Sequence, residues 1–122
     1  MNPELYKKLI NEFNNSNFKE SYNLAIKLNE NQHDEKILKI LTISSFKIQN
    51  YIDAIKYGLK LYTSKKKEND PQILNILGVS YSINKDYDNG NFFLEKFLLI
   101  NPKNISVKYN LALNYFEQKK YI

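Results

Sequence analysis

Few side chains in this chain could act as a nucleophile, an acid or a base. His33 is the single histidine and there is no cysteine, which excludes a disulfide, a thiol nucleophile and a cysteine zinc site. His33 lies in the polar stretch 29–35, which is typical of a solvated loop. A nucleophile paired with a base is therefore hard to assemble from these residues.

The nearby acidic residues have a simpler explanation than catalysis. The pair Asp34-Glu35 and the pair Asp86 and Asp88 fall at predicted turns or helix starts, where carboxylates cap the helix and oppose its dipole. The chain has no phosphate-binding Gly-rich loop, no H-E-x-x-H and no G-x-S-x-G sequence. We expect no enzyme activity, no metal site and no cofactor.

One sequence pattern occurs twice, 34 residues apart at every matching position. The two copies are Leu77-Gly78-x-x-Tyr81 with Lys85-x-Tyr87, and Leu111-Ala112-x-x-Tyr115 with Lys119-x-Tyr121. A period of about 34 residues is typical of stacked helix–turn–helix units, each too small to bury its apolar face alone. Such arrays build binding surfaces more often than catalytic pockets.

Local signals place two helices in the clearest unit, which begins at Asp70. Asp70 can cap the first helix and Pro71 suits its first position, while Asn101-Pro102 ends the second helix. Gly78 and Gly90 fall inside these helices, where each costs about 1 kcal/mol relative to Ala. Their presence indicates that two helix backbones approach closely there.

This unit resembles the tetratricopeptide repeat, whose pattern is Leu-Gly-x-x-Tyr, then Ala-x-x-x-Phe, then Pro. The matching residues are Leu77, Gly78 and Tyr81, with Gly90 for the small residue, Leu94 for the aromatic residue and Pro102. The resemblance covers the whole chain as one domain, with repeats at 2–34, 35–70 and 71–104 and a half repeat at 105–122. It implies an all-α solenoid of antiparallel pairs, about seven helices, with turns near 15–17, 30–34, 50–51, 63–70, 84–86 and 101–104.

The first repeat allows two registers. One register places Lys8 and Glu12 in the core, whereas a turn shorter by one residue places there Tyr6, Leu9, Ile10 and Phe13. We prefer the second, because all four residues are apolar. In the second repeat, the first helix is apolar on most sides, and the lysine run 65–67 is predicted to be a solvated loop.

The resemblance also implies a concave groove formed by the first helix of each repeat. The family's ligand-contacting positions correspond here to Lys7, Asn11, Asn14, Ser44, Lys47, Asn75, Val79, Ser82, Tyr109, Leu113 and Phe116. A protein or peptide partner is expected, in a scaffold or adaptor role, although these residues are also consistent with ordinary solvated surface. Lys7 and Asn11 match the first pair of the family's carboxylate clamp, but Leu41, Gln72 and Ile76 replace its other members.

The charge pattern and the lack of long apolar runs limit the other classes of partner. The net charge is +5 and all 18 basic residues are lysine. Nucleic-acid binders normally use arginine, so nucleic acid is a less favoured partner. No apolar run reaches the roughly 18 residues of a membrane span, and the N-terminus does not resemble a signal peptide. We expect a cytoplasmic protein.

The last predicted helix, 105–122, has apolar residues on more than one side. We expect Val107, Leu111, Tyr115 and Tyr121 on its core side, with further apolar residues left uncovered. Two explanations are expected: the chain is a fragment, or it covers this end by self-association. A third remains open, in which the helix caps the stack and tolerates a small apolar patch.

Overall fold

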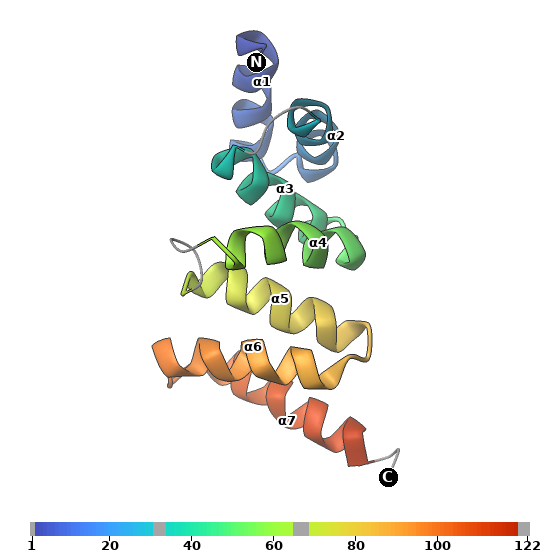
Figure 1. The fold of residues 1–122 in the computed structure, drawn as a ribbon, viewed down its shortest axis with the longest axis vertical. Coiled ribbons are helices and arrows are strands. Elements are labelled where there is room, and N and C mark those ends of the chain that lie inside the picture. The colour runs from blue at the N-terminus through green and yellow to red at the C-terminus, as the bar shows by residue number, and fades with distance from the viewer. Residues whose placement is uncertain (1, 31–33, 65–68, 120–122) are drawn as a thin grey trace. The chain divides into compact units, whose positions relative to one another are not determined.

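The computed structural model describes residues 2–30, 34–64 and 69–119, which form seven α-helices and no strand (Figure 1). The helices are α1 (Pro3–Asn14), α2 (Phe18–Asn29), α3 (Glu35–Lys47), α4 (Tyr51–Tyr62), α5 (Pro71–Ile83), α6 (Tyr87–Ile100) and α7 (Ile105–Lys119). Among the first three helices, α2 packs against α1 and α3, and among the last three, α6 packs against α5 and α7, so the predicted all-α helical-repeat class is confirmed. The predicted turns at 15–17, 84–86 and 101–104 agree, and the third spans 48–50 rather than 50–51. The predicted turns at 30–34 and 63–70 fall partly outside the described residues, at 31–33 and 65–68. His33 and the lysine run 65–67 lie outside the described residues.

Side-chain caps explain where several helices begin. The Asn2 carboxamide oxygen accepts hydrogen bonds from the N–H groups of Glu4 (3.0 Å) and Leu5 (3.2 Å). Asp70 accepts one from Gln72 N–H (2.9 Å), and proline follows both caps. These bonds satisfy N–H groups that have no partner inside the helix, as the sequence signals predicted.

Three of the turns have the same backbone geometry. Ser16, Gln49 and Lys85 each adopt a left-handed conformation, with φ of 60°, 65° and 65°. In each turn the N–H of the next residue bonds to the carbonyl five positions back, as Asp86 does to Tyr81 at 2.9 Å. This is the Schellman motif, which satisfies the last carbonyls of the first helix. The repetition predicted from sequence thus extends to the turn that joins each helix pair.

Backbone proximity divides the chain into two compact units, Met1–Leu61 and Tyr62–Ile122. In the first unit, α2 packs against both α1 and α3. Leu9 is fully buried, whereas Lys8 is exposed and forms an ion pair with Glu20 (3.8 Å). The preferred register of the first repeat is therefore confirmed.

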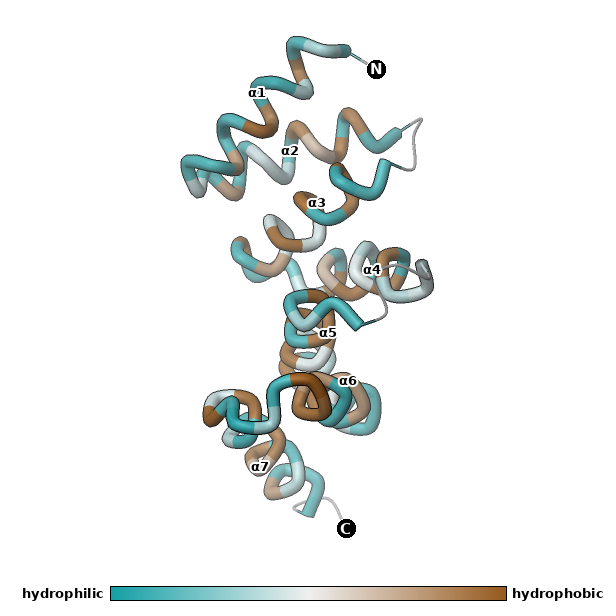
Figure 2. Tube along the Cα trace, turned by 90° about the vertical axis from the view of Figure 1, so that its left-hand side faces the viewer, coloured by the Kyte–Doolittle hydropathy of each residue, from teal (hydrophilic) through white to brown (hydrophobic). Residues whose placement is uncertain are grey.

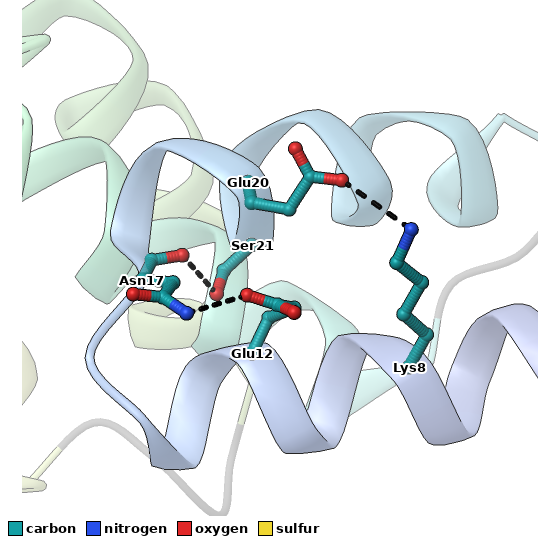
Figure 3. A network of polar contacts seen from close by, with 5 residues as sticks. All are labelled: Lys8, Glu12, Asn17, Glu20 and Ser21. Carbon is teal, nitrogen blue, oxygen red and sulfur yellow. Dashed lines mark hydrogen bonds and ion pairs between the residues drawn. The ribbon is translucent and has the colours of Figure 1, made fainter.

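Polar contacts also hold the turn between α1 and α2 (Figure 3). Asn17 Nδ2 donates to Glu12 Oε2 at 2.6 Å, and Ser21 Oγ donates to the Asn17 carbonyl at 2.8 Å. The Glu12 carboxylate thus holds Asn17 at the start of α2. Glu12 stabilises the turn and is not part of the apolar core.

In the second unit, α6 runs antiparallel to α5 and packs against both α5 and α7 (Figure 1). A Cβ on Gly78 would lie 2.5 Å from Leu94 Cδ2, and a Cβ on Gly90 would lie 3.2 Å from the Gly78 carbonyl oxygen. Real Cβ contacts are essentially never as short as the first and rarely as short as the second. The close approach predicted from the two glycines is therefore confirmed.

The buried side of α7 differs in part from the expectation. Val107 is buried as predicted and Leu111 is half-buried, but Tyr115 is 46% exposed and its hydroxyl donates to Glu95. The deepest side chain on this face besides Val107 is Asn114. The prediction for Tyr115 was wrong because α7 turns Val107 and Asn114, seven residues apart, toward α5 and α6. Tyr121 lies outside the described residues.

Hydrophobic and hydrophilic positions are interleaved along the helices, α7 included (Figure 2). Within residues 2–30, 34–64 and 69–119, no helix has the length and apolar character needed to cross a membrane.

Candidate binding surfaces

A groove of about 240 Å³ lies between α5 and α7 in the second unit. Its lining combines apolar side chains with amides and one carboxylate, contributed by α5, the start of α6, and α7. The lining residues are Val79, Ser82, Ile83, Tyr87, Asn110, Leu113, Asn114 and Glu117. The groove therefore offers apolar contact together with groups that can hydrogen-bond a peptide backbone.

A hydrogen-bonded amide network ties this part of the second unit together. Asn114 Nδ2 donates to Ser82 Oγ (2.7 Å) and to Asn91 Oδ1 (2.9 Å), and Asn91 Nδ2 donates to Gln118 Oε1 (3.0 Å). Asn91 and Asn114 are both buried. Since buried amides are costly unless bonded, this network fixes how α7 sits on α5 and α6. Two of the residues, Ser82 and Asn114, also line the groove.

The structure brings three of the predicted groove residues together in this groove: Val79, Ser82 and Leu113. Asn75 is half-buried and is not among the lining residues. Tyr109 and Phe116 are 63% and 58% exposed and lie on another side of α7, away from this groove.

Four of the five predicted residues of the first unit are accessible. Lys7, Asn11 and Asn14 are exposed on α1, and Lys47 is exposed with its ammonium 5.9 Å from the Phe18 ring centroid. Ser44, however, is fully buried, so the expectation that it faces a ligand is corrected. The reason is that α3 is buried on most sides: eight of its 13 residues are inaccessible, three of them hydroxyl residues at 42, 44 and 45.

The second unit's groove was only partly predictable. Asn110, Asn114, Ile83, Tyr87 and Glu117 were not among the expected residues. A usable signal was the polar Asn114 seven residues after the apolar Val107, where helical spacing expects another apolar residue. A buried asparagine at such a position indicates a polar network between helices.

Two other hollows are each formed by side chains of one helix. One is lined by Phe92, Glu95, Lys96, Leu98 and Leu99 of α6, and the other by residues 20, 22–24, 26 and 27 of α2. Both are larger than the groove, at about 480 Å³ and 460 Å³. Because neither is walled by a second element, we regard the α5–α7 groove as the better-formed binding surface.

A hydrogen bond to a carboxylate joins the start of α4 to α2. The Tyr22 hydroxyl of α2 donates to the Asp53 carboxylate, which also accepts from Asn50 Nδ2 at 3.2 Å. The bond to Asp53, followed by burial, raises the pKa of Tyr22 from its ordinary value of 10.0 to about 12. A phenol held neutral in this way joins two helices and is not activated for chemistry.

The described part of the chain contains no group of three or more His, Cys, Asp and Glu side chains that could hold a metal ion. Among known proteins, no family model and no curated protein matches this chain.

Proposed function

We propose that this chain is a tetratricopeptide-like interaction module that binds a peptide segment of a partner protein in the groove between α5 and α7. The observation that supports the proposal is the groove itself, with apolar walls at Val79, Ile83 and Leu113 and the amide of Asn110. Apolar pockets for anchor side chains beside groups that bond a backbone are the usual features of peptide-recognition surfaces.

The size of the groove favours a peptide over a small molecule. Sites for drug-sized ligands and cofactors commonly measure about 300–1,000 Å³. The groove is smaller, at about 240 Å³, so it suits the anchor side chains of a peptide better than a whole small molecule. Such a groove contributes part of an interface, with the rest of the peptide lying along α5 and α7.

Peptides selected from a displayed random library against the native chain provide the test. Leu113→Asp should weaken binding of a selected peptide at least about tenfold, which is about 1.4 kcal/mol. Asn110→Ala should weaken it less, because a single neutral hydrogen bond contributes about 1 kcal/mol. Leu99→Asp, which changes an equally apolar and more exposed residue on α6, is the matched control. If Leu99→Asp abolishes binding and Leu113→Asp leaves it intact, the groove is not the site.

Self-association is the second candidate function, and one observation favours it. Several large apolar residues of α7 are exposed, including Ile105 and Tyr109. Joining copies end to end would require a complementary apolar surface on α1, and none of the exposed large apolar residues described lies in α1. Sedimentation over a hundredfold range of concentration distinguishes a stable monomer from an associating chain.

A further inference from the structure

The side of α7 that faces away from α5 and α6 forms a continuous apolar stripe. Ile105, Tyr109, Ala112 and Phe116 are all exposed and are spaced four, three and four residues apart. Side chains at this spacing lie on one face of a helix. Ile105 is 80% exposed, and it is informative because it belongs to a group of exposed apolar residues rather than standing alone. We call this surface the outer face of α7.

The sequence repeat relates this face to one that already holds a helix. A shift of 34 residues aligns Ala112 with Gly78 and Phe116 with Ser82. On α5, Gly78 lies against Leu94 of α6, and Ser82 lies against Gly90 of α6. The outer face of α7 is thus the counterpart of the α5 surface that packs on α6. Its shape and apolar character suit another α-helix, packed across Ala112.

The charges beside this face indicate what kind of helix it suits. Lys108 and Lys119 are exposed, and each lies three residues after a member of the stripe, Ile105 and Phe116, so both flank the outer face of α7. The acidic residue of α7, Glu117, lines the groove on its other side. On α6, the carboxylate of Glu95 accepts the hydrogen bond of the Tyr115 hydroxyl. The charged α7 residues beside the outer face are therefore lysines. A partner helix with acidic residues on either side of its apolar stripe would be favoured.

A second copy of this chain suits the face less well. The exposed residues of α1 include Lys7, Lys8 and Asn11, so docking α1 there would place lysines against lysines. In an antiparallel pair of α7 helices about a two-fold axis, the flank with Lys108 and Lys119 would face the same flank of the other copy, which has no α7 carboxylate to pair with them. Like charges brought together in an interface are unfavourable.

We infer that the outer face of α7 binds an amphipathic α-helix of another polypeptide, whose apolar stripe is flanked by acidic residues. The stripe packs on Ile105, Tyr109 and Phe116, and the acidic flanks lie near Lys108 and Lys119. This surface is separate from the α5–α7 groove, and the inference does not depend on peptide binding there.

The repeat also specifies the residue that faces Ala112. At the equivalent position of α5, Leu94 of α6 occupies the space that a Cβ on Gly78 would need, 2.5 Å from Leu94 Cδ2. Ala112 has that Cβ. A partner helix near this separation therefore needs a side chain smaller than leucine opposite Ala112, such as alanine. Its backbone must also lie slightly farther away, because a Cβ on Gly78 would be only 3.2 Å from the Leu94 backbone nitrogen.

The test uses the full chain and synthetic helical peptides with a fluorescent label. The first peptide has a Leu and Phe stripe with a central Ala and glutamate flanks. A second replaces the glutamates by lysines, a third replaces the central Ala by Leu, and a fourth scrambles the first. Fluorescence anisotropy should show saturable binding of the first peptide. The other three should bind at least about tenfold more weakly, a difference of about 1.4 kcal/mol.

Matched variants of the protein locate the site. Ala112→Glu places a charge at the centre of the outer face. Glutamate is a good helix former, so α7 should be retained. Binding of the first peptide should weaken at least about tenfold. Ile52→Glu, at a 73% exposed isoleucine of the first unit, is the control and should leave binding unchanged. Asn110→Ala, in the groove, should also leave it unchanged, which separates this surface from the proposed peptide site.

Three results would overturn the inference. One is failure of the glutamate peptide to bind. Another is equal binding of the scrambled or lysine peptide, which would indicate non-specific adsorption. The third is concentration-dependent dimerisation of the native chain, measured by sedimentation and abolished by Ala112→Glu, which would make a second copy the occupant.

Discussion

Leu94 of α6 occupies the space that a side chain on Gly78 of α5 would need. A Cβ on Gly78 would lie 2.5 Å from Leu94 Cδ2 and 3.2 Å from the Leu94 backbone nitrogen. Both residues are buried, so neither can relax into solvent. The contact explains why a residue that weakens helices by about 1 kcal/mol occurs in the middle of α5.

Gly78→Ala should therefore destabilise the chain even though alanine is the better helix former. Overpacking typically costs about 1–3 kcal/mol, and the gain in helix propensity offsets about 1 kcal/mol of it. In a Leu94→Ala background the same change should cost less, because the Leu94 side chain is gone and only the 3.2 Å contact with the backbone nitrogen of residue 94 remains. Urea unfolding of the two single variants and the double variant measures the coupling. An equal cost of Gly78→Ala in the two backgrounds would mean that the Leu94 side chain is not the obstacle.

Lys85→Gly should stabilise the chain by about 1 kcal/mol, because a left-handed conformation is costly for residues with a Cβ and not for glycine. Lys85 has φ of 65° in the turn before α6. Ser16→Gly and Gln49→Gly, at the equivalent turns, should act in the same direction. Thermal unfolding measures the effect, and Asn84→Gly, one residue earlier with φ of −78°, is the control that should not stabilise. A lower melting temperature for all three turn variants would contradict the turn geometry.

Asn114→Ala should destabilise the second unit by about 1–3 kcal/mol. The change removes the donor to Ser82 Oγ and to Asn91 Oδ1, and leaves a buried amide oxygen of Asn91 without that bond. Asn23→Ala, at an exposed asparagine of α2, should stay within about 0.5 kcal/mol of the native chain. The backbone amides of α7 should show faster hydrogen exchange in Asn114→Ala than in the native chain, because the network holds α7 in place. Equal stability of the two variants would show that the network contributes little.

Tyr22→Phe should lower stability at neutral pH by about 1 kcal/mol, through loss of the hydrogen bond to Asp53. It should also change the alkaline unfolding profile. The pKa of Tyr22 is raised to about 12 in the folded chain, compared with about 10 for an unfolded tyrosine. Its contribution is therefore fully present below pH 10 and is lost as pH rises from about 10 to 12.

The native chain should accordingly lose more stability than Tyr22→Phe over that pH range. Because Tyr22 is partly exposed, solvent screening makes the loss smaller than the full shift implies. Tyr115→Phe, which removes a more exposed hydroxyl bonded to Glu95, serves for comparison and should change the profile less. Parallel profiles for the native chain and Tyr22→Phe would exclude the assigned interaction.

Local sequence signals determined where the helices begin and end, because the groups that end a helix lie within a few residues of its terminus. Asn2 with Pro3 and Asp70 with Pro71 cap α1 and α5 as predicted. The helical spacing of apolar residues also identified Leu9, rather than Lys8, as part of the core. The positive φ of Lys85 was not predicted, because lysine carries no sequence signal for a left-handed turn.

Residues that occupy the same position in different repeats are not equally buried, and tertiary packing decided which of them are. Tyr81 and Tyr115 are 34 residues apart, yet Tyr81 is half-buried and stacks on Phe93 with ring centroids 5.8 Å apart, whereas Tyr115 is 46% exposed. Ser44 is inaccessible, although the repeat predicted a groove position for it, whereas Ser82 lies in the α5–α7 groove. A repeat sequence specifies the face of a helix on which a residue lies. Whether that face is covered depends on the neighbouring helix, because burial is a property of the packed pair.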